Sequence, residues 1–155
     1  MKSILFVCSA NQCRSPMAEV LFKQLVSEHG EQDDWRIESA GVWAYGGAPA
    51  TENAQRAMKE RKLDLSRHRS QPATNELLSQ FDRIIVMTRE HRETLLAQMP
   101  ALAGKVLLLR ELGGESGDFA DPVGGSIEVY RRAADEIQAL LSSGYSSFNS
   151  LVGIE

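Results

Sequence analysis

The chain has 155 residues, 43% hydrophobic and 25% charged, and this composition fits one globular domain. Its formal net charge of −4 excludes the broad basic field that nucleic acids and anionic membranes attract. Its apolar runs are far shorter than the roughly 20 residues that span a bilayer, and two cysteines are too few for a disulfide framework or a four-thiolate metal site. We therefore expect a cytoplasmic protein with no nucleic-acid or membrane partner, in which any anion site is local.

Short apolar segments alternate with longer amphipathic segments along the chain, as in parallel strands joined by helical crossovers. Strands are predicted at residues 4–8, 36–40, 83–87 and 106–109, and helices at 15–29, 51–62, 74–81, 88–99 and 127–141. Strands and helices that alternate in this way predict an α/β fold with one open four-stranded parallel sheet.

The end of the chain differs in composition from the rest. The apolar face of the last predicted helix runs from Ile127 to Leu141, and the residues that follow are rich in Ser and Gly. We therefore place a single domain at residues 1–142 and expect residues 143–155 to form a partly disordered tail. No internal repeat or long linker divides the chain.

The segment directly after the first predicted strand carries the strongest chemical signal. Ligands of open parallel sheets bind outside the carboxyl ends of the strands. The segment consists of Cys8, Ser9, Ala10, Asn11, Gln12, Cys13, Arg14 and Ser15. Its backbone amides can turn inward around an anion, and the N-terminus of the following helix adds a partial positive charge. Residues 8–15 are therefore predicted to form a phosphate-binding loop.

Cys8 and Arg14 supply the reactive groups of this loop. The field that holds a phosphate also favours the thiolate of Cys8, which is its nucleophilic form. Arg14 offers a planar fork for two phosphate oxygens, and the hydroxyl of Ser15 can stabilise the thiolate when it leaves. A cysteine at the end of a buried strand is usually a core residue. The interpretation therefore depends on the strand, the polar loop and the capped helix together.

Residues 7–19, with the sequence VCSANQCRSPMAE, resemble the signature of the low-molecular-weight protein tyrosine phosphatases. Similar segments follow at residues 39–41, 64–68 and 81–87 and at Asp121-Pro122, so the resemblance covers nearly everything except the tail. It implies a single domain with helices on both faces of the sheet and with no metal or organic cofactor. It also implies phosphorylated protein substrates, with phosphate or other oxyanions as product or inhibitor.

Asp121 is the second catalytic candidate. An Asp-Pro pair in a loop is most often only a turn, but this one follows the last predicted strand and so belongs to the same sheet edge as Cys8. Attack on a phosphate ester needs an acid for the leaving oxygen and then a base that activates water. The resemblance assigns both roles to Asp121, with a phosphocysteine intermediate on Cys8.

Four polar residues match family positions that shape and brace the loop, namely Asn11, Ser15, Ser39 and His68. Each also has a simpler interpretation. Asn11 tolerates a left-handed backbone, Ser15 can cap the helix, Ser39 can end a strand, and His68 can be a structural histidine. For His68 taken alone we favour the structural role.

The residues expected at the mouth of the phosphate-binding site are compatible with two classes of substrate. Trp43 and Tyr45 can either wall the mouth or cover the core at the sheet edge. Gln12 stands where tyrosine phosphatases usually have a hydrophobic residue, and Val123 stands where they have an aromatic one. Residues 121–130 look closer to the protein arginine phosphatases of the same family, which prefer a small residue such as Thr at the position of Gln12. The sequence predicts a phosphotyrosine phosphatase, with phosphoarginine as the alternative substrate.

Other functional classes fit less well. Arsenate reductases share this fold and loop, but they require further cysteines, and none follows Cys13. A non-catalytic phosphate-binding module would have lost Cys8, Arg14 or Asp121, and all three are present. Cys13 is either a packing residue or the partner of Cys8 in a disulfide that protects the nucleophile from irreversible oxidation.

Overall fold

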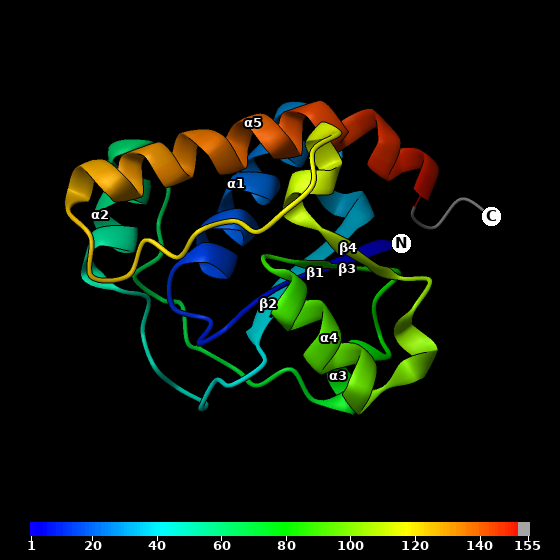
Figure 1. Ribbon diagram of the computed structural model, residues 1–155. Coiled ribbons are helices and arrows are strands. Elements are labelled where there is room, and N and C mark those ends of the chain that lie inside the picture. The colour runs from blue at the N-terminus through cyan, green and yellow to red at the C-terminus, as the bar shows by residue number, and fades with distance from the viewer. Residues whose placement is uncertain (152–155) are drawn as a thin grey trace.

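The computed structural model describes the backbone of residues 1–151 and the side chains of residues 1–148. One sheet of four parallel strands, in the order β2-β1-β3-β4, lies at its centre (Figure 1). The strands are β1 (Lys2–Cys8), β2 (Trp35–Gly41), β3 (Arg83–Val86) and β4 (Val106–Leu108). They agree with the predicted ranges to within a few residues, and the predicted open parallel sheet is confirmed.

Helices cover both faces of the sheet, as expected (Figure 1). One face carries α1 (Arg14–Glu28), α2 (Glu52–Glu60) and α5 (Ile127–Leu151), and the other carries α3 (Asn75–Leu78) and α4 (Arg89–Gln98). The short 3-10 helices are η1 (Gln32–Asp34), η2 (Pro100–Leu102) and η3 (Leu109–Gly113). The helices α2, α3 and α4 each begin after a threonine whose hydroxyl accepts a backbone N–H of the first turn.

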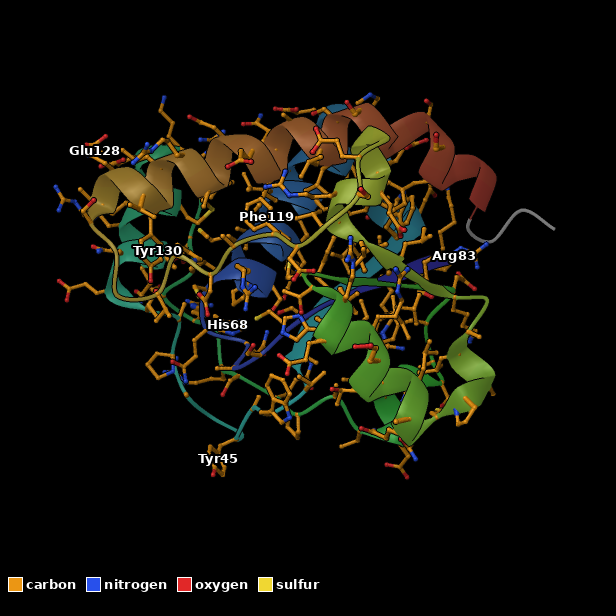
Figure 2. All side chains as sticks on the ribbon, in the orientation of Figure 1. Tyr45, His68, Arg83, Phe119, Glu128 and Tyr130 are labelled. Carbon is orange, nitrogen blue, oxygen red and sulfur yellow. The ribbon has the colours of Figure 1, made fainter. Side chains whose placement is uncertain are left out.

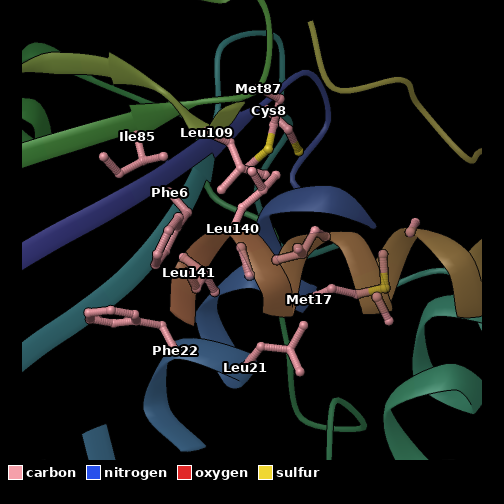
Figure 3. Close-up of a cluster of buried hydrophobic side chains, with 14 of the residues drawn as sticks. Phe6, Cys8, Met17, Leu21, Phe22, Ile85, Met87, Leu109, Leu140 and Leu141 are labelled. Carbon is pink, nitrogen blue, oxygen red and sulfur yellow. The ribbon is translucent and has the colours of Figure 1, made fainter. Parts of the chain in front are cut away.

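Strand β1 is buried on both faces because its side chains alternate between two cores. Phe6 and Cys8 pack with α1 and α5 in one core (Figure 3), whereas Leu5 and Val7 pack with α3 and α4 in the other. Complete burial of a side chain such as Phe6 stabilises the fold by about 1.5–3 kcal/mol. The first core therefore fixes the end of β1, where Cys8 lies.

The end of the chain corrects one prediction. Helix α5 continues to Leu151 instead of ending near Leu141, and its Phe148 is buried with its ring 5.2 Å from that of Phe22. Gly144 lies so close to η3 that an added Cβ would be 3.0 Å from Leu112 Cβ. This glycine therefore permits close packing, whereas the sequence suggested fraying. The remainder of the expected tail, residues 152–155, lies outside the described residues.

Candidate active site

The predicted phosphate loop connects β1 with α1 at the carboxyl edge of the sheet. Strand β1 lies between β2 and β3, so the chain leaves β1 where the order of the strands reverses. Asn11 takes a left-handed conformation (φ 58°) within the loop. Gly41 at the end of β2 approaches the loop so closely that a Cβ would be 2.6 Å from Ser9 O. The bend and the close approach together explain an asparagine and a glycine at these two positions.

Cys8 is buried at the base of the loop, with its Sγ 2.9 Å from Ser15 Oγ. Ser15 Oγ also accepts a hydrogen bond of 2.8 Å from the side-chain amide of Asn11. The Ser15 hydroxyl hydrogen can therefore point to the sulfur, as a thiolate requires. Helix α1 begins at Arg14 without a side-chain cap, so the interpretation of Ser15 as a helix cap is wrong.

The Asn11 side chain is buried at the centre of a hydrogen-bond network. Its Nδ2 donates to Ser15 Oγ at 2.8 Å and to Ser39 Oγ at 2.9 Å, and its Oδ1 accepts from Gln71 N at 3.0 Å. Ser39 in turn donates to Glu19 Oε1 at 2.6 Å. All polar groups of the Asn11 amide are thus engaged, which keeps this side of the loop in one conformation.

His68 contacts the same side of the loop from outside. Its Nε2 lies 2.7 Å from the carbonyl oxygen of Asn11 and donates to it. The structure therefore brings together all four residues that the sequence placed around the loop (Asn11, Ser15, Ser39 and His68).

The Arg14 guanidinium is buried, and one of its three nitrogens lacks a hydrogen-bond partner among the described residues. Its Nη1 donates to Phe119 O at 2.9 Å, and its Nη2 lies 3.3 Å from Ser9 Oγ and 3.4 Å from Asp121 Oδ2. Arg14 Nε has no hydrogen-bond partner among the described residues. A buried donor that stays unpaired costs about 1–3 kcal/mol, and an oxyanion in the loop would relieve that cost. The free Nε–H therefore indicates an anion site.

Asp121 lies beside this loop, although it is 107 positions from Arg14 in the sequence. Its Oδ1 accepts from Val123 N at 3.0 Å and from Cys13 Sγ at 3.3 Å, and its side chain is 38% exposed. The pKa of the Cys13 thiol is raised by burial and, secondarily, by the negative charges of Asp121 and Cys8. Cys13 is therefore a neutral donor that orients the carboxylate, which stays open to water. Both cysteines are free.

His91, which was not among the residues predicted for the site, is buried beside the loop. Its Nε2 is 2.9 Å from Ser9 Oγ. The pKa of His91 is lowered to about 4, mainly by burial and secondarily by the charge of Arg14, while Asp118 and Asp121 partly oppose the change. The available signal was its position three residues after Thr88, where a capping-box side chain lies. That pattern predicts a cap, but it gives no sign of the contact with Ser9.

The mouth residues are much more exposed than the loop. Trp43 and Val123 are 52% and 59% exposed, and the Trp43 ring lies 5.9 Å from that of His91. Tyr45 is 88% exposed and points away from the site at the outer edge of the molecule (Figure 2). The exposure of Tyr45 contradicts the interpretation that its ring covers the core. Gln12 is half-buried, and Ala10 is exposed.

Two further properties hold for the described residues. None of their helices has the length and apolar character needed to cross a membrane. Nor do three of their His, Cys, Asp or Glu side chains gather where they could hold a metal ion.

The parallel sheet, the cysteine–arginine loop after its first strand and the aspartate beside that loop define a class, the cysteine-dependent phosphatases. The chain belongs to the low molecular weight phosphotyrosine protein phosphatase family, whose model matches residues 3–149. This result confirms the resemblance drawn from the sequence.

Individual relatives support the assignment. A protein-arginine-phosphatase of Bacillus subtilis is 40% identical over 139 residues, which cover 89% of this chain and 91% of the relative. A probable low molecular weight protein-tyrosine-phosphatase, EpsP of Ralstonia nicotianae, is 36% identical and covers 89% and 90%. The solved YwlE arginine phosphatase with a phosphorylated active-site serine is 37% identical, covers 95% of both chains and has a TM-score of 0.90.

Proposed function

We propose that this protein hydrolyses phosphorylated side chains of other proteins through a phosphocysteine intermediate on Cys8. The observation that carries the proposal is the unpaired Nε of Arg14, a buried cation with a free donor in the loop that begins at Cys8. Because a guanidinium binds two oxygens of a phosphoryl group, this donor supports a role of Arg14 as the phosphate clamp.

The proposed reaction has two steps. The Cys8 thiolate attacks phosphorus, the bond from phosphorus to the substrate oxygen or nitrogen breaks, and the Asp121 carboxyl gives its proton to the leaving atom. Asp121 then takes a proton from water, which attacks the phosphocysteine and releases phosphate and the Cys8 thiolate. The hydroxyl of Ser15, 2.9 Å from the sulfur, can stabilise that thiolate. The exposure of Asp121 supports the second step because water must reach its carboxylate.

Phosphotyrosine is the first candidate substrate because the chain belongs to a phosphotyrosine phosphatase family. Phosphoarginine is the second candidate, and a specific observation favours it. Val123, two residues after Asp121, is exposed and offers no ring for a phenol to stack on, which leaves the carboxylate open to a cationic guanidinium. The identity with a protein-arginine-phosphatase agrees with this candidate. We further place the enzyme in the cytoplasm, where a reducing environment keeps Cys8 in its reduced form.

Hydrolysis of phosphotyrosine and phosphoarginine peptides by the wild type and by Cys8→Ser tests the proposal. We expect Cys8→Ser to abolish both activities and rapid acid quenching to trap a phosphocysteine in the wild type alone. Cys13→Ser is the matched control, since it removes the other thiol of the loop and should still form the intermediate. Activity that survives in Cys8→Ser would overturn the mechanism, and the wild-type ratio of the two rates identifies the substrate.

A further inference from the structure

A chain of hydrogen bonds links helix α4 to the Arg14 guanidinium. The backbone N–H of Thr88 donates to His91 Nδ1 at 3.2 Å, and His91 Nε2 lies 2.9 Å from Ser9 Oγ. Arg14 Nη2 donates to the same Ser9 oxygen at 3.3 Å. The Ser9 hydroxyl therefore connects a histidine outside the loop with the arginine inside it.

The contact with Thr88 determines the direction of each bond in this chain. A backbone N–H can only donate, so His91 Nδ1 is an acceptor, and the single hydrogen of the neutral ring is on Nε2. That hydrogen points to Ser9 Oγ, which already accepts from Arg14. Two donors occupy both lone pairs of the Ser9 oxygen, and its own hydrogen has no acceptor among the described residues. The hydroxyl is thus prepared as a donor at the edge of the anion loop.

We propose that Ser9 donates its hydroxyl hydrogen to the bound phosphoryl group and that His91 is a positioning residue, which orients Ser9 and, through it, the Arg14 guanidinium. This inference rests on the proposed phosphatase function. It assigns to the loop one side-chain donor besides Arg14, and it gives the buried histidine of α4 a role in anion binding.

The electrostatic surroundings are consistent with a permanent arrangement at neutral pH. His91 is buried against the Arg14 cation, and both factors lower its pKa, whereas the carboxylates of Asp118 and Asp121 only partly oppose them. The ring therefore stays neutral and keeps Nδ1 free to accept the Thr88 hydrogen. A protonated ring would lose the hydrogen bond from Thr88. That bond determines the direction of the hydrogen bonds between His91, Ser9 and Arg14.

A role confined to the structure of α4 makes a different prediction. A capping box needs only His91 Nδ1 as an acceptor, so the Nε2 contact with Ser9 would then be incidental. Loss of His91 would in that case lower stability without changing anion affinity. The two roles can be separated because stability and anion affinity are measured independently.

The test compares His91→Leu, Ser9→Ala and the double variant by their inhibition constants for inorganic phosphate and by kcat/KM. Each single change should weaken phosphate inhibition by about tenfold, the effect of one hydrogen bond to a charged group. The double variant should be little worse than either single one, because His91 acts through Ser9. His91→Gln, which keeps an acceptor and a donor, should restore most of the affinity.

Thr74→Ala is the control for stability, since the Thr74 hydroxyl caps α3 by accepting from Leu77 N and does not bond to the loop. It should lower the melting temperature and leave phosphate inhibition unchanged. Equal phosphate inhibition in the wild type and Ser9→Ala, or multiplying losses in the double variant, would overturn the proposal. Ser9→Ala keeps the test decisive if His91→Leu does not fold.

Calorimetric titration of inorganic phosphate into the same variants on a Cys8→Ser background separates this inference from the proposed function. Weaker phosphate binding in Ser9→Ala together with no hydrolysis by the wild type would leave the positioning role standing and refute the phosphatase activity. Unchanged phosphate binding in Ser9→Ala together with normal wild-type hydrolysis would refute the role of Ser9 and leave the phosphatase activity standing.

Discussion

The two regions that make up the candidate site are built differently. Around the loop of residues 8–15, buried polar side chains such as Asn11 and Ser15 are held by several hydrogen bonds. At the mouth, Trp43 and Val123 are each more than half exposed. A change in a buried network leaves other groups unpaired, whereas a change at an exposed position disturbs little. We therefore expect changes near the loop to affect catalysis and stability, and changes at the mouth to affect only the choice of substrate.

Asp121→Ala should have the largest effect on rate among the residues that border the loop. Loss of a general acid and base typically slows turnover by about 10²–10⁴-fold. The fold should persist because the Asp121 side chain is partly exposed. Steady-state kinetics measures the turnover rate, and thermal unfolding followed by circular dichroism measures the stability of the fold. Asp118→Asn, in the same segment, is the control, and a near-normal rate in Asp121→Ala would contradict the assignment.

Mild peroxide should inactivate the enzyme completely but reversibly. The Cys8 thiolate reacts first, since Cys13 is held as a neutral thiol by burial and by Asp121. Condensation of the oxidised Cys8 with Cys13 would then form a disulfide that reductant opens. Mass spectrometry should find this disulfide in the wild type and a sulfinic acid on Cys8 in Cys13→Ser. A sulfinic acid in the wild type, with Cys13 still reduced, would contradict the prediction.

Asn11→Ala should destabilise the protein by about 2–4 kcal/mol, because it removes buried hydrogen bonds to Ser15, Ser39 and Gln71 N and leaves the Gln71 N–H without its acceptor. Part of this loss is backbone strain at a positive φ. Asn11→Gly removes the strain and should recover about 1 kcal/mol of it. Urea unfolding measures both variants. Full recovery in Asn11→Gly would show that the network itself contributes little.

The stability of the wild type should fall in acid more steeply than that of His91→Gln. The pKa of His91 is about 4 in the folded protein and 6.5 for an ordinary histidine. Below pH 6.5 the unfolded chain therefore binds a proton that the folded one excludes, and the stability contributed by neutral His91 is lost between pH 6.5 and 4. The loss is at most about 3 kcal/mol. Urea unfolding of the wild type and of His91→Gln at pH 7 and at pH 4 measures this loss. An equal loss of unfolding free energy in both proteins would contradict the prediction.

The mouth should show the smallest effects. Val123→Tyr adds a ring beside Asp121 and should raise the ratio of phosphotyrosine to phosphoarginine hydrolysis several-fold, on the scale of one aromatic contact of about 1 kcal/mol. The melting temperature should hardly move because Val123 is exposed. Tyr45→Ala is the matched control, since that ring points away from the site. An equal change of the ratio in both variants would mean that the comparison between loop and mouth fails.

The sequence by itself determined the parallel sheet, the helices on most of their ranges and the loop of residues 8–15. These are local signals, because strand periodicity, the polar turn and a threonine before a helix depend on neighbouring residues. A family resemblance added Asp121 and the bracing residues Ser39 and His68, which no local pattern singles out.

The tertiary structure alone decided which side chains meet. The bond from His91 to Ser9 spans 82 positions, and the burial of Phe148 against Phe22 depends on how α5 packs on α1. Both are contacts between segments that are distant in the sequence. Their geometry follows from the packing of whole helices and strands, so no local sequence pattern predicts it. For the same reason, the sequence left open whether Tyr45 walls the mouth or covers the core, and the structure shows its ring exposed at the outer edge of the molecule.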